Sequence, residues 1–121
     1  MNASGPVPDP ARALLNLLGL AARARKVVYG TDMARSAARD GSLAAALVAA
    51  DASPTQSRKL VPLLEARGVP FVVCLSRAEL GAAMGRGPVS AVGFTDPSFA
   101  RRALELAHAP PAQDRAGGEP Y

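Results

Sequence analysis

The sequence predicts a three-layer α/β/α sandwich, with helices on both faces of a sheet of about four strands. Helix and strand signals alternate along the chain, which is typical of this class. The length of 121 residues suits one domain with a core of its own. Aromatic residues make up only 4% of the chain, so alanine, valine and leucine must build that core, and small side chains suit helices packed closely on a sheet.

The expected helices begin at residues typical of helix N-termini. Asp9-Pro10 combines an N-cap with a proline at the first helical position. Serine opens a capping box at residues 53–56 and another at residues 76–79. Pro62 lies inside the third helix, where it removes a backbone donor, so we expect two helical pieces or a kink there. The expected helices cover residues 9–26, 30–41, 53–68, 76–84 and 95–107.

Four apolar runs predict the strands, at residues 27–29, 43–50, 70–75 and 89–94. Leu43–Ala50 is continuously apolar, the pattern of a strand buried on both faces. Pro70–Leu75 is expected to be buried in the same way, with Cys74 as a small apolar side chain within it.

The two ends of the chain are rich in proline, glycine and polar residues. We expect residues 1–8 and 108–121 to be disordered tails around a domain at residues 9–107. No apolar stretch approaches the roughly 20 residues that a bilayer needs. The basic residues follow the first apolar segment rather than precede it, which argues against a signal peptide. A cytoplasmic protein without a membrane partner is therefore expected.

Residues that carry chemistry are few. The single cysteine, Cys74, excludes a disulfide within the chain, and the single histidine, His108, argues against imidazole-based catalysis. The sequence has no Walker loop, dinucleotide-binding glycine pattern or nucleophile elbow. Asp32, Asp51 and Asp96 each follow a predicted strand and could together hold magnesium, but two of them stand at helix starts. We expect no metal, no cofactor and no enzymatic activity.

The charge distribution is compatible with a polyanionic partner. The net charge is +4, and the excess lies in residues 1–67, which hold nine basic and five acidic groups. Arginine, whose guanidinium group can donate two parallel hydrogen bonds to a phosphate or a guanine edge, supplies 12 of the 14 basic residues. For the arginine content taken alone, a compositional bias is the favoured explanation, since alanine, glycine and proline are abundant as well.

Two segments suit a phosphate-rich ligand. The turn Gly30–Asp32 opens the second helix, whose N-terminus offers backbone N–H groups and partial positive charge. One exposed stripe of that helix is expected to hold Asp32, Arg35 or Ser36, and Arg39. The loop Gly85–Pro88 combines glycines, which permit close approach of a ligand, with the charge of an arginine. Each segment alone is also compatible with a solvated helix face or an ordinary turn.

Four blocks of sequence together resemble the superfamily of ribosomal protein L-seven-Ae, and most closely its small bacterial YlxQ-like branch. These blocks are LLGLAARA, AADASP, SRAELGAAMG and VGFTDPSFA. The resemblance runs from about Leu14 to Leu106. It implies an α/β/α sandwich with a mixed four-stranded sheet, and binding of RNA, often at kink-turns, in ribosomes and other ribonucleoproteins.

The resemblance also implies where RNA would bind. Relatives carry Gly-x-Asn-Glu-x-x-Lys in the strand-to-helix turn, and further contacts lie in the loop before the last strand. Gly30 matches the glycine of that pattern, whereas Asp32 stands at the asparagine, Met33 at the glutamate and Ser36 at the lysine. Asp32 offers only acceptors, Met33 cannot accept from a base N–H, and Ser36 brings no charge. These departures bear on kink-turn recognition more than on RNA binding in general.

We therefore expect a non-enzymatic protein that binds structured RNA, kink-turn-like or ribosomal. Thr31 and Asp32 are expected to touch base edges, while Arg35 and Arg39 grip the backbone and the loop Gly85–Pro88 packs on the other side of a bent groove. Protein partners in a ribonucleoprotein, translation or transcription assembly would accompany the RNA. The alternatives are a protein–protein interaction module on the same fold, and a binder or enzyme for a phosphorylated small molecule at the strand ends.

Basic residues near the end of the first helix, Arg23, Arg25 and Lys26, would extend the positive surface. The expected RNA-binding residues are Lys26, Gly30, Thr31, Asp32, Met33, Arg35, Ser36, Arg39, Gly85, Arg86, Gly87 and Pro88.

Overall fold

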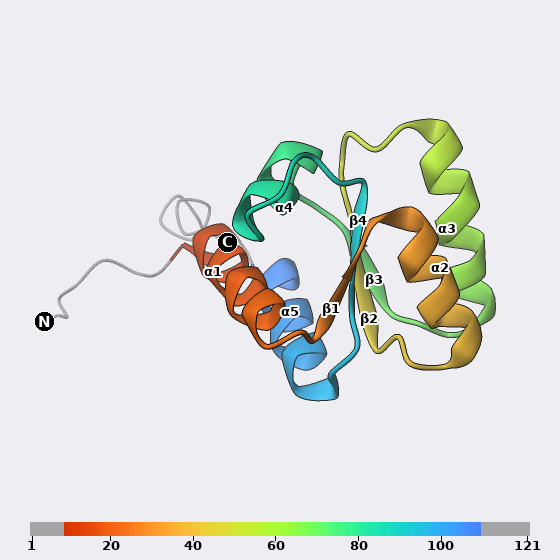
Figure 1. The fold of residues 1–121 in the computed structure, drawn as a ribbon, viewed down its shortest axis with the longest axis horizontal. Coiled ribbons are helices and arrows are strands. Elements are labelled where there is room, and N and C mark those ends of the chain that lie inside the picture. Colours follow the sequence, from red (N-terminus) through yellow and green to blue (C-terminus); the bar gives the residue numbers. More distant parts are fainter. Residues whose placement is uncertain (1–8, 110–121) are drawn as a thin grey trace, which may run out of the picture.

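The computed structural model describes residues 9–109, in which helices and strands alternate as predicted (Figure 1). The helices are α1 (Pro10–Arg23), α2 (Gly30–Asp40), α3 (Pro54–Ala66), α4 (Arg77–Ala83) and α5 (Pro97–His108). The strands are β1 (Val27–Tyr29), β2 (Ala45–Val48), β3 (Phe71–Val73) and β4 (Ala91–Phe94). The last helix includes His108, which the sequence analysis assigned to the C-terminal tail; residues 1–8 and 110–121 lie outside the described residues.

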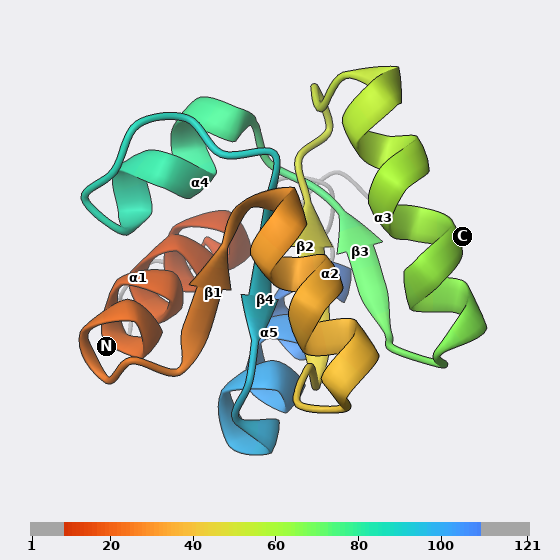
Figure 2. The ribbon, with the colours of Figure 1, turned by 45° about the vertical axis from the view of Figure 1, so that its right-hand side comes forward.

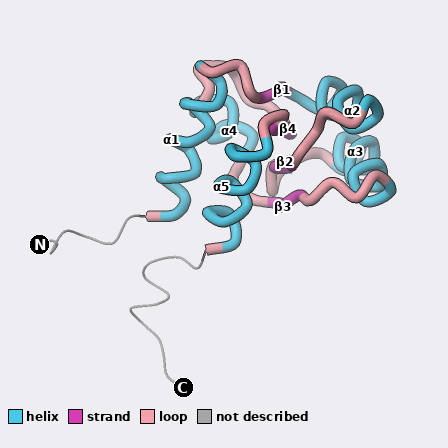
Figure 3. Tube along the Cα trace, turned by 90° about the horizontal axis from the view of Figure 1, so that it is seen from below, coloured by secondary structure: helices cyan, strands magenta, loops and turns pink. Residues whose placement is uncertain are grey.

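The sheet forms the middle of three layers, which confirms the predicted fold class. Helices α2 and α3 cover one face, and α1, α4 and α5 lie on the other (Figures 1 and 3). The strand order is β1-β4-β2-β3, in which β4 is antiparallel to both of its neighbours and β2 is parallel to β3. The sheet is thus mixed, as the family resemblance implies.

The core lies on both faces of the two central strands. In β2, Ala45 and Leu47 join the cluster under α1 and α5, whereas Ala46 and Val48 join the cluster under α2 and α3. This alternation follows from the two-residue period of a strand. All four residues of β2 are buried, which confirms the expectation from its continuous apolar run.

The third strand is not buried as expected. Strand β3 lies at the edge of the sheet, and Val73 is 55% exposed. The expectation was wrong because an apolar run does not show whether its strand has neighbours on both sides. Cys74 follows this strand and is half-buried, and burial, with a smaller effect from Glu79, raises the pKa of its thiol. The thiol therefore stays protonated at neutral pH and has little nucleophilic character.

The helices begin at the predicted capping residues. Two predictions for α3, a capping box at its start and a break at Pro62, differ from the structure. Ser53 accepts from the backbone N–H of Gln56 at 3.2 Å, but the reciprocal hydrogen bond of a capping box is not formed. Helix α3 is continuous through Pro62, so the expectation of two helical pieces was wrong. Pro62 and Arg58 are both exposed, so water can solvate the carbonyl that loses its helical partner. Within residues 9–109, none of the helices is long and apolar enough to cross a membrane.

The capping box of α4 gives a first testable prediction. The Ser76 hydroxyl accepts from the N–H of Glu79 at 3.0 Å, and the Glu79 carboxylate accepts from the N–H of Ser76 at 2.9 Å. Ser76→Ala should lower the free energy of unfolding by about 1 kcal/mol, measured by urea denaturation. Ser98→Ala leaves the Asp96 cap of α5 in place and should change it by less than about 0.5 kcal/mol. Equal effects of the two substitutions would contradict a role for the box in holding α4.

Candidate nucleic-acid interface

The turn between β1 and α2 leaves a helix N-terminus without a side-chain cap. Gly30 has φ +84°, a conformation that glycine adopts without strain, and it joins the strand to the helix. Tyr29 occupies the N-cap position and makes no capping hydrogen bond, whereas each of the other described helices has a serine or aspartate cap. The first N–H groups of α2 and the positive end of its dipole are thus available to an anion.

The loop between α4 and β4 is held close to the end of α4. The backbone N–H of Arg86 donates to the carbonyl of Gly81 at 2.8 Å. A Cβ atom on Gly81 would overlap the carbonyl group of Gly87 and lie 3.1 Å from the carbonyl oxygen of Arg86. The path of the loop therefore requires glycine at position 81.

The fold brings this loop beside the turn at Gly30. The guanidinium carbon of Arg86 lies 3.6 Å from the centroid of the Tyr29 ring, in the geometry of a cation–π contact. The start of α2 and the loop before β4 also lie at the same end of the sheet (Figure 2). Sequence reasoning did not include Tyr29 among the site residues. Its position directly before the glycine turn, in a chain poor in aromatics, was the available signal.

The exposed stripe of α2 differs from the predicted one. Asp32, Ser36 and Arg39 are exposed as expected. Arg35, by contrast, is half-buried, and its guanidinium donates to the backbone carbonyl of Lys59 in α3. The stripe therefore runs through Ser36, and Arg35 serves the contact between α2 and α3.

Thr31 and Met33, both in the first turn of α2, differ in their exposure to solvent. Thr31 is only 6% exposed, which corrects the expectation that its side chain touches a base edge. It is buried because it shares the inner face of α2 with Ala34 and Ala38, at helical spacing. Met33 is 53% exposed, in the first turn of the helix. An exposed thioether beside an uncapped helix N-terminus offers an apolar contact to a ligand.

Basic side chains at this surface lack acidic partners in the described part of the chain. The ion pairs found within residues 9–109 join Arg77 to Asp51 and Arg102 to Glu105, and neither includes Arg39 or Arg86. Arg67 adds charge at the other end of α2, where it donates to the carbonyl of Arg39 at 3.2 Å.

Lys26 is exposed but lies at the far end of β1 from the turn. Four residues of extended chain span about 13 Å, so the fold does not bring Lys26 together with Gly30.

Two of the three aspartates considered for a metal have structural roles. Asp51 accepts from the N–H of Arg77 at 2.8 Å and lies 3.7 Å from its guanidinium Nε, and Asp96 caps α5. Within the described ranges, no cluster of three or more histidine, cysteine, aspartate and glutamate side chains could hold a metal ion.

Comparisons with known proteins agree with this fold and its sequence pattern. Residues 12–104 match the ribosomal protein L7Ae/L30e/S12e/Gadd45 family. Two curated relatives carry the name RNA-binding protein YlxQ. The one from Bacillus subtilis (strain 168) is 37% identical over 90 residues, which are 74% of this chain and 90% of that protein. The one from Enterococcus faecium is 32% identical over 92 residues, which are 76% of this chain and 88% of that protein.

Solved structures share the architecture. A protein with unknown function from Bacillus halodurans superposes with a TM-score of 0.76 at 30% identity, over 79% of this chain and 97% of its own. The 15.5kD RNA binding protein of Giardia lamblia superposes with a TM-score of 0.68 over 84% of this chain and 88% of its own; at 23% identity it supports the fold alone. The chain therefore belongs to the ribosomal protein L7Ae/L30e/S12e/Gadd45 family, within its YlxQ-like bacterial branch.

Proposed function

We propose that this protein binds structured RNA, without enzymatic activity, through one surface at the end of the sheet. We call this surface the RNA face and define it by Gly30, Asp32, Met33, Ser36, Arg39 and Gly85–Pro88. The observation that carries the proposal is the contact of Arg86 with the Tyr29 ring, which joins the two segments into one surface. The names of the curated relatives support the same partner class.

The chemistry of the RNA face suits phosphate better than it suits base reading. The uncapped N–H groups of α2 can donate to phosphate oxygens, and Arg86 adds charge beside the turn that opens the helix. Arg39, in the last turn of α2, adds charge at the far end of the exposed stripe. Met33 can pack on a ribose or a base. Asp32 is the one acidic group of the RNA face, and it accepts from a base edge but repels phosphate.

The two segments approach a ligand from different elements, α2 and the loop after α4, so a bent RNA would contact both. A kink-turn-like or ribosomal RNA within a ribonucleoprotein is the target we propose. The side chains at positions 32, 33 and 36 would make binding depend on shape and charge more than on base identity.

A salt titration of two double variants tests the proposal. Arg39→Ala combined with Arg86→Ala removes two phosphate contacts, so the slope of log K against log salt should become shallower by about 2. Affinity for a kink-turn RNA should fall at low salt, measured by mobility shift. The matched control is Arg101→Ala with Arg102→Ala. It makes the same charge change on exposed positions of α5, in the opposite helical layer. Equal loss in both variants would show non-specific attraction, and no loss in the first would remove the RNA face from the mechanism.

A further inference from the structure

A groove lies between α1 and α5, on the face of the sheet away from α2 and α3 (Figure 3). It has a volume of about 220 Å³ and is lined by Leu17 of α1 and by Ser98, Phe99 and Arg102 of α5. Leu20 follows Leu17 by one turn, on the same side of α1, and is 52% exposed. An exposed large apolar side chain next to an apolar groove indicates a surface that a partner covers.

The groove is far from the turn that opens the RNA face. Strand β4 is antiparallel to β1, so α5, which follows β4, begins at the end of the sheet where β1 begins. Helix α2 begins at the other end, where β1 ends, and Figure 2 shows the starts of the two helices at these opposite ends. A ligand at the turn therefore leaves the groove open to a second partner.

The floor of the groove suits an apolar side chain. Leu17 and Phe99 pack against the core beneath them and stay partly exposed. An apolar cavity of about 150 Å³ can hold benzene, so the larger groove has room for one leucine or phenylalanine side chain. An apolar groove between two helices is the kind of site that receives the apolar face of an amphipathic helix.

Positive charge surrounds this floor. Arg102 lines the groove, and within residues 9–109 its ion pair is with the neighbouring Glu105, at the exposed surface of the same helix. Arg25 and Lys26, both exposed, lie at the end of the groove where α5 begins, because Thr95 donates its backbone N–H to the carbonyl of Lys26 at 2.9 Å. The four lining residues include no carboxylate. These charges favour an acidic partner.

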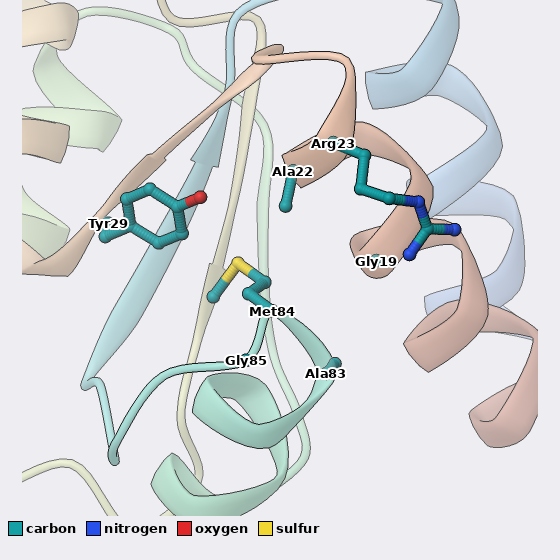
Figure 4. Close-up of a pocket in the computed structure, with 7 residues that line it drawn as sticks. All are labelled: Gly19, Ala22, Arg23, Tyr29, Ala83, Met84 and Gly85. Atoms are coloured by element: carbon teal, nitrogen blue, oxygen red, sulfur yellow. The ribbon is translucent and has the colours of Figure 1, made fainter.

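Two other charged residues near the groove are engaged elsewhere. Arg23 lines a separate cleft on the α4 side of α1, together with Tyr29 and Met84 (Figure 4). Asp96 accepts from the N–H of Ser98 as the N-cap of α5. The charge that the groove presents to a partner is therefore positive.

We propose that this groove binds an acidic segment of a partner protein as an amphipathic helix, independently of RNA. One large apolar side chain of that helix enters the groove, and its carboxylates face Arg102 and the end of α1. A second copy of this chain would bring the same cations against each other, which opposes self-association. RNA phosphates would meet the cations but leave the apolar floor and Leu20 without a matching contact.

Three fluorescent peptides of about five helical turns test the inference. The first has leucine at every third or fourth position and glutamate elsewhere, the second has lysine in place of glutamate, and the third has serine in place of leucine. The full chain should bind the first peptide and should bind each of the others at least about 10-fold more weakly, measured by fluorescence anisotropy.

Variants of the full chain locate the binding. Arg102→Glu should weaken binding of the glutamate peptide at least about 10-fold, whereas Arg101→Glu, the same charge change outside the lining, should weaken it less than about 3-fold. Ser98→Phe fills the groove from an exposed position and should abolish peptide binding while RNA binding is unchanged. Ala82→Phe, at an exposed position of α4, should keep peptide binding.

Four results would overturn the inference and leave the proposed function standing. They are no binding of the glutamate peptide, equal binding of the glutamate and lysine peptides, unchanged peptide binding by Ser98→Phe, and displacement of the peptide by kink-turn RNA, which would make RNA the occupant. Self-association of the chain that Ser98→Phe abolishes, measured by light scattering, would make a second copy the occupant and overturn it as well.

Discussion

Gly81→Ala is expected to destabilise the domain and to abolish binding at the RNA face together. The added methyl group would lie 2.6 Å from the carbonyl carbon of Gly87 and 3.1 Å from the carbonyl oxygen of Arg86. Backbone, unlike a side-chain tip, cannot rotate away, so either α4 or the loop must move. Overpacking of this kind lowers the free energy of unfolding by about 1–3 kcal/mol, and a clash with backbone belongs at the upper end. The same movement would carry Arg86 away from Tyr29.

Thermal unfolding and RNA titration measure the two effects separately. Each 1 kcal/mol should lower the Tm by about 4–8 °C in a domain of this size. The matched control is Gly87→Ala, on the other side of the same contact, where a Cβ atom would meet nothing within 4 Å. It should leave the Tm within about 3 °C, since its expected effect is below about 0.5 kcal/mol. A stable Gly81→Ala variant that binds RNA normally would contradict the role assigned to the loop.

Restoring the family pattern in α2 is expected to create recognition of kink-turns. The variant combines Asp32→Asn, Met33→Glu and Ser36→Lys, all at exposed positions, so the fold should tolerate it. Each of the first two changes supplies a base-edge contact worth about 1–3 kcal/mol of discrimination. Preference for a kink-turn over a straight duplex should therefore rise by at least about 30-fold, measured by fluorescence anisotropy at one salt concentration.

A charge-matched variant distinguishes base reading from electrostatics. Asp40→Asn removes the same charge as Asp32→Asn, but at the C-terminal end of α2, where Asp40 accepts from the N–H of Ser42 at 2.8 Å. It should leave the preference for kink-turns unchanged. If the triple variant instead gained affinity equally for both RNAs, the gain would be due to charge alone, and the departures at these positions would not determine the target.

The sequence predicted the features that depend on neighbouring residues in the chain. The capping of α1 by Asp9 and the box of Ser76 with Glu79 are local, and both are present. The order of elements followed from the same local signals, and the mixed sheet and the family followed from the resemblance. The location of β3 at the sheet edge could not be predicted from the sequence, because an apolar run does not indicate which strands lie beside it.

Within the site, the residues that escaped prediction depend on contacts between elements. Helical spacing places Arg35 and Ser36 equally well on an outer stripe, and only the packing of α3, whose Lys59 carbonyl accepts from Arg35, distinguishes them. Thr31 is buried on the inner face of α2, which it shares with Ala34 and Ala38. Tyr29 gains its role from Arg86, which is distant in sequence and reaches it through the glycine contact at the end of α4.

Amide chemical shifts of the full chain during RNA titration test the central claim most directly. The account predicts that the perturbed amides cluster at Gly30–Arg39 and Gly85–Val89, the segments joined by the contact between Tyr29 and Arg86. Amides of α5, in the opposite helical layer, should keep their shifts. Perturbations that concentrate on α5 and leave the start of α2 unchanged would contradict the account.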